Sequence, residues 1–169
     1  MSYTTILELK QGRDPVMLTE LMNSHGSAPV IWDEIGKRHL GWTQNWRLQD
    51  LEILWPLHKR KDIPFHHRAV LMMTFDNAYV KRKNFKRAAK DIRKFMQDFP
   101  KKEGKVNHWP AIADLFDKYR KKECHAIGIW HTSVTENPFL GDYDDESEVY
   151  LPIDWKKLYE IYETLEAIK

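Results

Sequence analysis

The sequence predicts an α+β fold that is mainly α, with five to seven helices around one core and a small two-stranded sheet. In several segments apolar residues recur at intervals of three and four, which is typical of amphipathic helices. Only two short segments have the β-branched and apolar composition of strands. The chain has 169 residues, a length that favours one domain, 1–169, with a core that needs no disulfide or metal.

The start of the chain predicts one strand followed by two helices. Residues 3–10 are few and rich in β-branched residues, as strands are. Asp14 and Pro15 form a favourable helix start, a capping acid before a proline, and Gly26 ends that helix. A second helix is expected over 27–41. Together the two helices have the outline of a helix-turn-helix motif.

Further helices are expected in the rest of the chain. The segments 84–99 and 107–122 are the clearest, because their apolar residues form a single stripe at helical spacing. Residues 64–80 fit either a buried helix or a long strand, and their length favours a helix. A short helix over 45–54 and a last helix capped by Asp154 complete the set.

The second strand is expected over 124–134. Neither this segment nor the strand over 3–10 has another obvious partner, so the two are expected to pair. Alternation along the strand places Ile127 and Ile129 on the same face. A polar and acidic loop then runs to Pro152.

No part of the sequence predicts a membrane segment, a signal peptide or a disulfide. No apolar run approaches the roughly 20 residues that cross a bilayer, and the N-terminus lacks a basic region followed by an apolar one. Cys124 is the single cysteine, which excludes an internal disulfide. These features predict a soluble, cytoplasmic protein. No cofactor is expected, because the sequence has no Gly-rich phosphate loop and no HExxH motif.

The charge of the chain is small in sum and uneven in its distribution. The net charge is +2. Residues 81–105 contain eleven Lys or Arg and three acids, a net charge of +8. Residues 136–169 contain ten acids and three lysines, a net charge of −7. Such a split indicates an acidic partner, or two regions that face each other.

We therefore expect a binding module without catalytic activity, which contacts nucleic acid or an acidic protein through a basic amphipathic helix. If the apolar stripe of 84–99 faces the core, the basic residues face solvent and can neutralise an acidic partner. Alternatively, the acidic end of the chain covers them, or the opposite charges of two copies meet in a homo-oligomer. The expected contact residues are Lys81, Arg82, Lys83, Lys86, Arg87, Lys90, Arg93 and Lys94.

A competing prediction is a hydrolase whose site gathers a histidine and the acidic loop at 142–148. Such groups can act as acid and base or hold a metal ion. The loop does not match an EF-hand, because Ser147 would occupy its sixth position and Ile153 its twelfth. A phosphodiester-acting version would use the His-x-Ser tripeptides that begin at His25 and His131. The site residues of this alternative are His131, Asp142, Asp144 and Asp145.

Two further groups of residues are candidates for a site. Trp42 and Trp46 have polar neighbours in the sequence and could form a partner or ligand surface. His66 and His67 open the helix expected over 64–80, but adjacent residues do not share a helix face. We therefore predict that the two histidines do not bind a metal ion together, and no metal site is expected.

Overall fold

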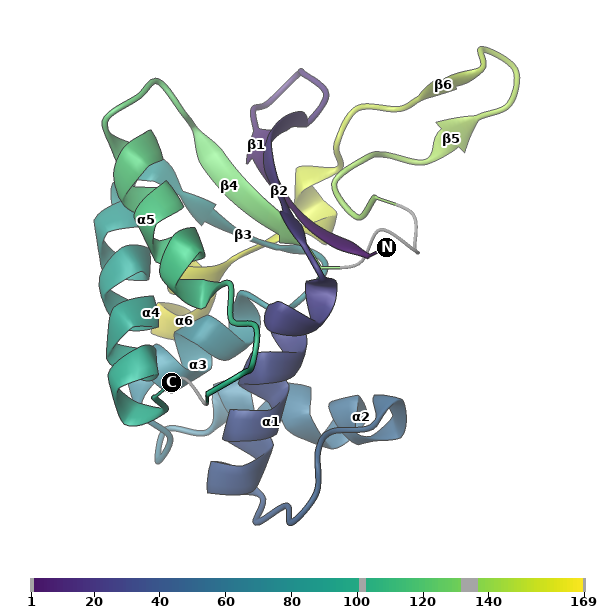
Figure 1. Ribbon diagram of the computed structural model, residues 1–169. Coiled ribbons are helices and arrows are strands. Elements are labelled where there is room, and N and C mark those ends of the chain that lie inside the picture. Colours follow the sequence, from purple (N-terminus) through teal and green to yellow (C-terminus); the bar gives the residue numbers. More distant parts are fainter. Residues whose placement is uncertain (1, 101–102, 132–136, 169) are drawn as a thin grey trace.

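The computed structural model describes residues 2–100, 103–131 and 137–168. A five-stranded mixed sheet with the order β2-β1-β4-β3-β7 lies at its centre (Figure 1). β3 and β7 are parallel, and the other neighbours are antiparallel. The expected fold class, mainly α with a two-stranded sheet, is therefore wrong: the fold is α+β, 46% helical and 18% strand. The strands of the sheet are β1 (Tyr3–Leu9), β2 (Val16–Met22), β3 (Ala78–Lys81), β4 (Ala126–Trp130) and β7 (Tyr159–Glu160).

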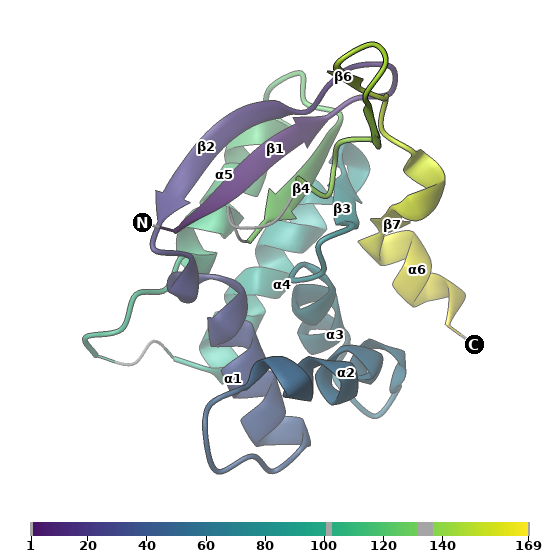
Figure 2. The ribbon, with the colours of Figure 1, turned by 90° about the vertical axis from the view of Figure 1, so that its right-hand side faces the viewer.

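Helices pack against one face of this sheet (Figure 2). α4 and α5 lie side by side, and α3 lies against α4. Large, fully buried aromatic side chains form much of the core on this side, among them Phe85 and Phe95 of α4 and Trp109 of α5. None of the helices in the described part of the chain is both long and apolar enough to cross a membrane. The α-helices are α1 (Ala28–His39), α2 (Leu51–Leu54), α3 (Phe65–Met72), α4 (Phe85–Asp98), α5 (Trp109–Arg120) and α6 (Ile161–Ala167).

The helices with the clearest apolar stripes and the strand expected over 3–10 are confirmed. Of the strand expected over 124–134, residues 126–130 form β4, and residues 132–134 lie outside the described residues. α1, α4 and α5 match the predicted helices to within about two residues at each end, whereas α2 covers only the last part of 45–54. β1 pairs antiparallel with β4, with Ile6 opposite Ile129. Ile127 and Ile129 face the helices, and Ala126 faces the other side of the sheet, as strand alternation requires.

The segment predicted to be the first helix is the edge strand β2. Gly12 has a φ of +73°, a left-handed conformation that suits glycine, and the chain turns there so that β2 pairs with β1. The register shifts between Ile6 and Leu7, so Leu18 and Leu21 both contact the core although they lie three residues apart. Their helix-like spacing is thus accommodated by an irregular strand, and the helix-turn-helix outline is wrong.

The segment 64–80 contains both a helix and a strand. α3 ends at Met72, and the hydroxyl group of Thr74 donates to the carbonyl oxygen of Leu71 at 2.7 Å. The chain then turns and enters β3, whose first three residues are buried between β4 and β7. The chain from Asp154 onward is divided in the same way, into a 3₁₀ helix (Trp155–Lys157), β7 and α6.

The second face of the sheet is covered by the segment that was expected to be a polar loop. Phe139 is fully buried there, against Leu7, Leu9 and Tyr79. Its ring lies over Gly128 of β4: a Cβ atom added to that glycine would be 2.5 Å from Cζ of Phe139. Further along, the same segment forms a two-stranded hairpin of β5 (Tyr143–Asp144) and β6 (Val149–Tyr150).

Candidate functional site

The acidic C-terminal helix neutralises part of the basic surface within the chain. Lys81 and Lys83 both contact Glu163 of α6, with Nζ–Oε distances of 2.8 and 2.9 Å. Arg87 of α4 pairs with Glu166, three residues further along α6. Hydrogen bonds from the two lysines hold the pKa of the Glu163 carboxyl below its usual range. Three of the eight expected contact residues are therefore engaged inside the molecule.

Arg87 also joins three helices through its flat guanidinium group. The group lies 4.4 Å from the ring centre of Phe65 in α3 and 4.6 Å from that of Tyr162 in α6. The hydroxyl group of Tyr162 donates to Asp91 of α4 at 3.0 Å. Burial raises the pKa of the Asp91 carboxyl, and that hydrogen bond partly offsets the rise. These contacts hold α6 against α3 and α4.

Replacing Arg87 by lysine is expected to lower the free energy of unfolding by about 1 kcal/mol. Lysine keeps the charge, but it cannot stack on two rings or reach Glu166 with the same planar group. Urea denaturation followed by circular dichroism measures the change. Lys86→Ala, on the same helix and without an acidic partner in the described chain, is the control and should change stability by less than about 0.5 kcal/mol. Equal effects of the two substitutions would contradict the role of Arg87.

Arg93 is engaged on the other side of α4. Its two terminal nitrogens lie 2.7 Å from Asp114 and 2.7 Å from Asp117, both on α5. This fork-shaped contact joins α4 to α5, and exposed ion pairs of this kind contribute about 0–1 kcal/mol each. Four of the expected contact residues have no acidic partner among the described residues, and these are Arg82, Lys86, Lys90 and Lys94.

Three of these four cations form a row on the exposed face of α4. Lys86, Lys90 and Lys94 are four residues apart and exposed to solvent. At a rise of 1.5 Å per residue their Cα atoms lie roughly 6 Å apart along the helix. Like charges at this spacing repel each other by about 0.2–0.5 kcal/mol per pair. The guanidinium group of Arg82, just before α4, donates to the carbonyl oxygen of Arg120 at 3.4 Å. We call the three lysines of this row and the neighbouring Arg82 together the α4 row.

The histidine of the alternative site is part of the core. His131 is 5% exposed, and its Nε2 donates to the carbonyl oxygen of Met73 at 2.7 Å. Its ring lies 6.0 Å from that of Trp109. Burial lowers the pKa of His131 to about 4, although the hydrogen bond to Met73 opposes this. The other ring nitrogen, Nδ1, is buried and has no hydrogen-bond partner in the described part of the chain.

The carboxylates of the alternative site lie on or beside the exposed hairpin. Asp144 accepts from the amide of Glu146 at 3.1 Å and from the hydroxyl group of Ser147 at 2.5 Å, which lowers the pKa of Asp144. Asp142 lies 3.5 Å from the ammonium group of Lys157. Asp145 is exposed in the turn between the two strands. Among the described residues, no contact joins any of these carboxylates to the buried histidine, so the structure does not bring this set together.

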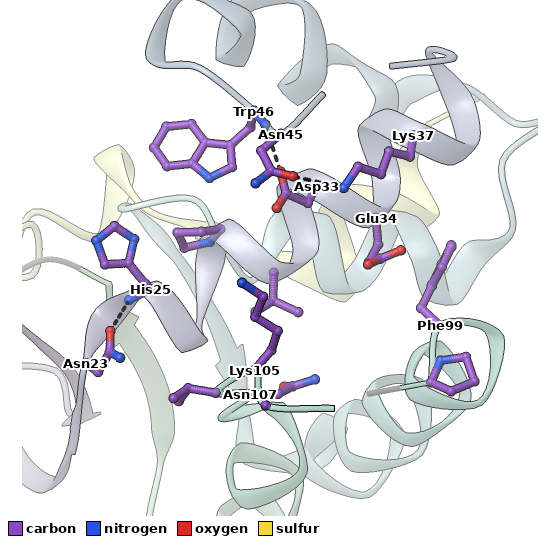
Figure 3. Close-up of a pocket in the computed structure, with 15 residues that line it drawn as sticks. Asn23, His25, Asp33, Glu34, Lys37, Asn45, Trp46, Phe99, Lys105 and Asn107 are labelled. Carbon is purple, nitrogen blue, oxygen red and sulfur yellow. Dashed lines mark hydrogen bonds between the residues drawn. The ribbon is translucent and has the colours of Figure 1, made fainter. Parts of the chain in front are cut away.

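The phosphodiester-acting version of that site lacks the expected strand placement. His25 lies in a 3₁₀ helix (Ser24–Gly26) at the entrance to α1, not on a strand. Thr132 and Ser133, the other members of the second tripeptide, lie outside the described residues. His25 instead forms part of the wall of a cavity (Figure 3).

This cavity has a volume of about 440 Å³ and lies between α1 and the segment after α4. Figure 3 shows Asp33, Glu34 and Lys37 of α1 on one side and Lys105 on the other. Asp33 accepts from the amide of Trp46 at 2.7 Å, and Lys37 donates to the amide oxygen of Asn45 at 3.1 Å. The described part of the lining contains both carboxylates and amines, so the charge of these residues does not select one class of ligand.

The two candidate tryptophans have different environments. Trp46 lines the cavity and packs edge-on against Trp32, with ring centres 4.6 Å apart. Trp42 packs over Gly36, where an added Cβ atom would lie 2.0 Å from its ring. Trp42 therefore covers α1, and only Trp46 lies on a concave surface that a ligand could reach.

A histidine and aspartate cluster joins three helices at the C-terminal end of α4. Nε2 of His66 and Nε2 of His67 lie 2.5 and 2.9 Å from the same oxygen, Oδ2 of Asp98. Behind them, Nε2 of His39 at the end of α1 lies 2.9 Å from Nδ1 of His67. The two adjacent histidines were predicted not to bind a metal ion together, but their side chains converge on one carboxylate oxygen. Both side chains lie in the first turn of α3 and reach a carboxylate that α4 places between them.

The environment of the cluster favours a neutral His67 next to an ionised Asp98. The side chains of His66 and His67 are 7% and 4% exposed, whereas that of Asp98 is 42% exposed. Burial lowers the pKa of His67 to about 4, although the bond to Asp98 opposes this. Hydrogen bonds from the histidines, with that from His66 the stronger, lower the pKa of Asp98. The pair of adjacent histidines was the only sequence signal of this cluster, because Asp98 lies more than 30 residues away.

No family model, curated protein or solved structure matches the chain.

Proposed function

We infer that this protein is a binding module that contacts an acidic macromolecule, nucleic acid or an acidic protein, through the α4 row. The proposal is based on which of the expected basic residues form ion pairs within the chain. Four of the eight make ion pairs within the chain, and four have no acidic partner among the described residues. The basic surface without acidic partners is therefore smaller than the eight-residue surface expected from the sequence.

The physical support is the repulsion within the row and the rigidity of the helix that carries it. α4 is held in place by Phe85, Ile92 and Phe95, all fully buried, so its exposed cations are presented at fixed spacing. A polyanion that neutralises them relieves their repulsion and releases its own counterions. With at most four phosphate contacts, the expected affinity for duplex nucleic acid is weak, about 10⁻⁴–10⁻⁶ M at physiological salt.

The test is a triple charge reversal, Lys86→Glu, Lys90→Glu and Lys94→Glu, in binding measurements by fluorescence anisotropy with mixed-sequence DNA and RNA. For the natural chain, the slope of log K against log salt is expected to be about −3 to −4, and the triple variant should reduce its magnitude by about 3. An acidic peptide of matched length, measured in the same way, distinguishes nucleic acid from an acidic protein as the partner.

A matched control has the same change in net charge on other surfaces: Lys59→Glu, Lys61→Glu and Lys156→Glu, three exposed lysines without an acidic partner in the described chain. Equal losses of binding in the two triple variants would show that only net charge matters and would refute the proposed face. Light scattering at low and high salt tests the alternative of self-association. A mass that doubles at low salt would assign the free charges to a homo-oligomer instead.

A further inference from the structure

Two buried imidazoles from the start of α3 and one carboxylate from the end of α4 place their donor atoms in one small volume. We propose that His66, His67 and Asp98 bind one divalent transition-metal ion, such as Zn²⁺, and that His39 is a positioning residue that acts through His67. This site lies at the C-terminal end of α4. It does not depend on the basic residues of the α4 row, so either proposal can fail without the other.

The spacing of the donor atoms is close to that of a metal site. One ring nitrogen of each histidine and a carboxylate oxygen of Asp98 all lie within 4.8 Å of one another. In a tetrahedral zinc site, with bonds of about 2.0–2.2 Å, the donor atoms lie roughly 3.3–3.5 Å apart. The two nitrogens are 2.5 and 2.9 Å from the oxygen. An outward shift of Asp98 by about 1 Å or less would therefore create the space for the ion, and this is the exposed member of the set.

The donor set defines the class of ion. Imidazole nitrogen is a ligand for Zn²⁺, Co²⁺, Ni²⁺ and Fe²⁺, whereas Mg²⁺ and Ca²⁺ take oxygen ligands. Two nitrogens and one carboxylate fill three coordination positions. The exposure of Asp98 leaves the remaining positions open to water or a further ligand. Phe95 and Phe99, with ring centres 5.3 and 5.1 Å from that of His67, form an apolar wall on the inner side.

His39 contacts the ring nitrogen of His67 that does not face Asp98, so it can orient the His67 ring. When His67 binds a metal ion through Nε2, its proton must be on Nδ1, and Nδ1 lies 2.9 Å from Nε2 of His39. His39 Nε2 can accept that proton's hydrogen bond, which fixes the ring orientation and the tautomer of His67. Without the ion the direction reverses: His67 Nε2–H donates to Asp98, and Nδ1 accepts from His39. We therefore expect metal binding to change the tautomers of His67 and His39 together.

The experiment is calorimetric titration of the chelator-treated protein with ZnCl₂ and with CoCl₂, where the cobalt absorption spectrum reports nitrogen and oxygen coordination. The natural chain is expected to bind one ion. His66→Gln and Asp98→Asn should each weaken binding by more than about 100-fold, and His39→Gln by about 10–100-fold. His125→Gln, at an exposed histidine far from the cluster in the sequence, should change the affinity by less than about twofold. Absence of binding to the natural chain at micromolar protein, an unchanged affinity in Asp98→Asn, or equal competition by Ca²⁺ would overturn the proposal.

A second measurement uses the natural chain alone, so it does not depend on the folding of any variant. Long-range nitrogen–proton NMR spectra distinguish the two tautomers of each histidine. Addition of Zn²⁺ is expected to convert His66 and His67 from Nε2–H to Nδ1–H. His39 should change in the same way, from Nε2–H to Nδ1–H, so that its Nε2 accepts the new hydrogen bond from Nδ1–H of His67. Unchanged tautomers of His66 and His67 at saturating Zn²⁺ would overturn the metal site. A change in these two without a change in His39 would overturn the positioning role.

Discussion

Replacing Phe139 by alanine is expected to lower the free energy of unfolding by about 3–5 kcal/mol, the usual cost of removing a fully buried phenylalanine. The side chain has 0% exposure and fills the space between the second face of the sheet and the segment that covers it. Guanidinium denaturation measures the loss. Val149→Ala, further along the same segment and 53% exposed, is the control, with an expected change below about 0.5 kcal/mol.

The contact between Phe139 and Gly128 allows a second, more specific test of this packing. Gly128→Ala alone should destabilise the protein by about 1–3 kcal/mol, because the new Cβ atom would overlap the phenylalanine ring. In the Phe139→Ala background the ring is absent, and the same substitution should be neutral or stabilising by about 0.5–1 kcal/mol, as expected for alanine over glycine in a strand. A double-mutant cycle measures the coupling. Additive effects of the two substitutions would contradict the stacking of Phe139 on Gly128.

The second large effect expected is a loss of stability in acid caused by His131. Its pKa is about 4 in the folded protein and 6.5 in an unperturbed histidine, because burial disfavours the charged form. Above pH 6.5 the group is neutral in both states and has no effect. Between pH 6.5 and 4 the unfolded chain takes up a proton that the folded chain excludes, so stability falls by about 1.4 kcal/mol per pH unit, about 3 kcal/mol in all. Below pH 4 this contribution levels off.

The measurement compares the natural chain with His131→Gln, whose amide can still donate to the carbonyl oxygen of Met73. Free energies of unfolding in urea are determined from pH 7 to pH 4. Other acid-sensitive groups affect both proteins equally, so the stability difference isolates His131. The advantage of the natural chain over the variant should shrink by about 3 kcal/mol across this range. A constant difference would show that His131 is not held neutral by burial.

Several elements could be predicted from local sequence alone, and each of them has a strong internal signal. The stripe that includes Phe85 and Phe95 identified α4, and the corresponding stripe of α5 is led by Trp109. β1 and β4 could be paired because each was left without another partner. The row of lysines on α4 and its exposure also followed from the stripe, since a helix that buries one side must expose the other.

The strands that were missed owe their conformation to partners far along the chain. β2 is a strand because β1 provides its hydrogen bonds, and a shift in register absorbs the helix-like spacing of its leucines. β3 has only four residues, and β7 only two, so neither contains enough residues for a periodic signal. The covering role of Phe139 depends on Gly128, which lies on a strand that the local sequence does not connect with it.

The amphipathic helices, the separation of basic and acidic charge and the exposed face of α4 can all be read from local sequence. Which charges meet depends on the packing of the elements, because Glu163 and Glu166 reach Lys81 and Arg87 across about 80 residues of chain. The packing also places Asp98 between two adjacent histidines whose side chains were expected to diverge on the helix. The physical reason is common to both cases: a local pattern fixes the direction in which a side chain leaves its own element, whereas its partner is fixed by how the elements pack.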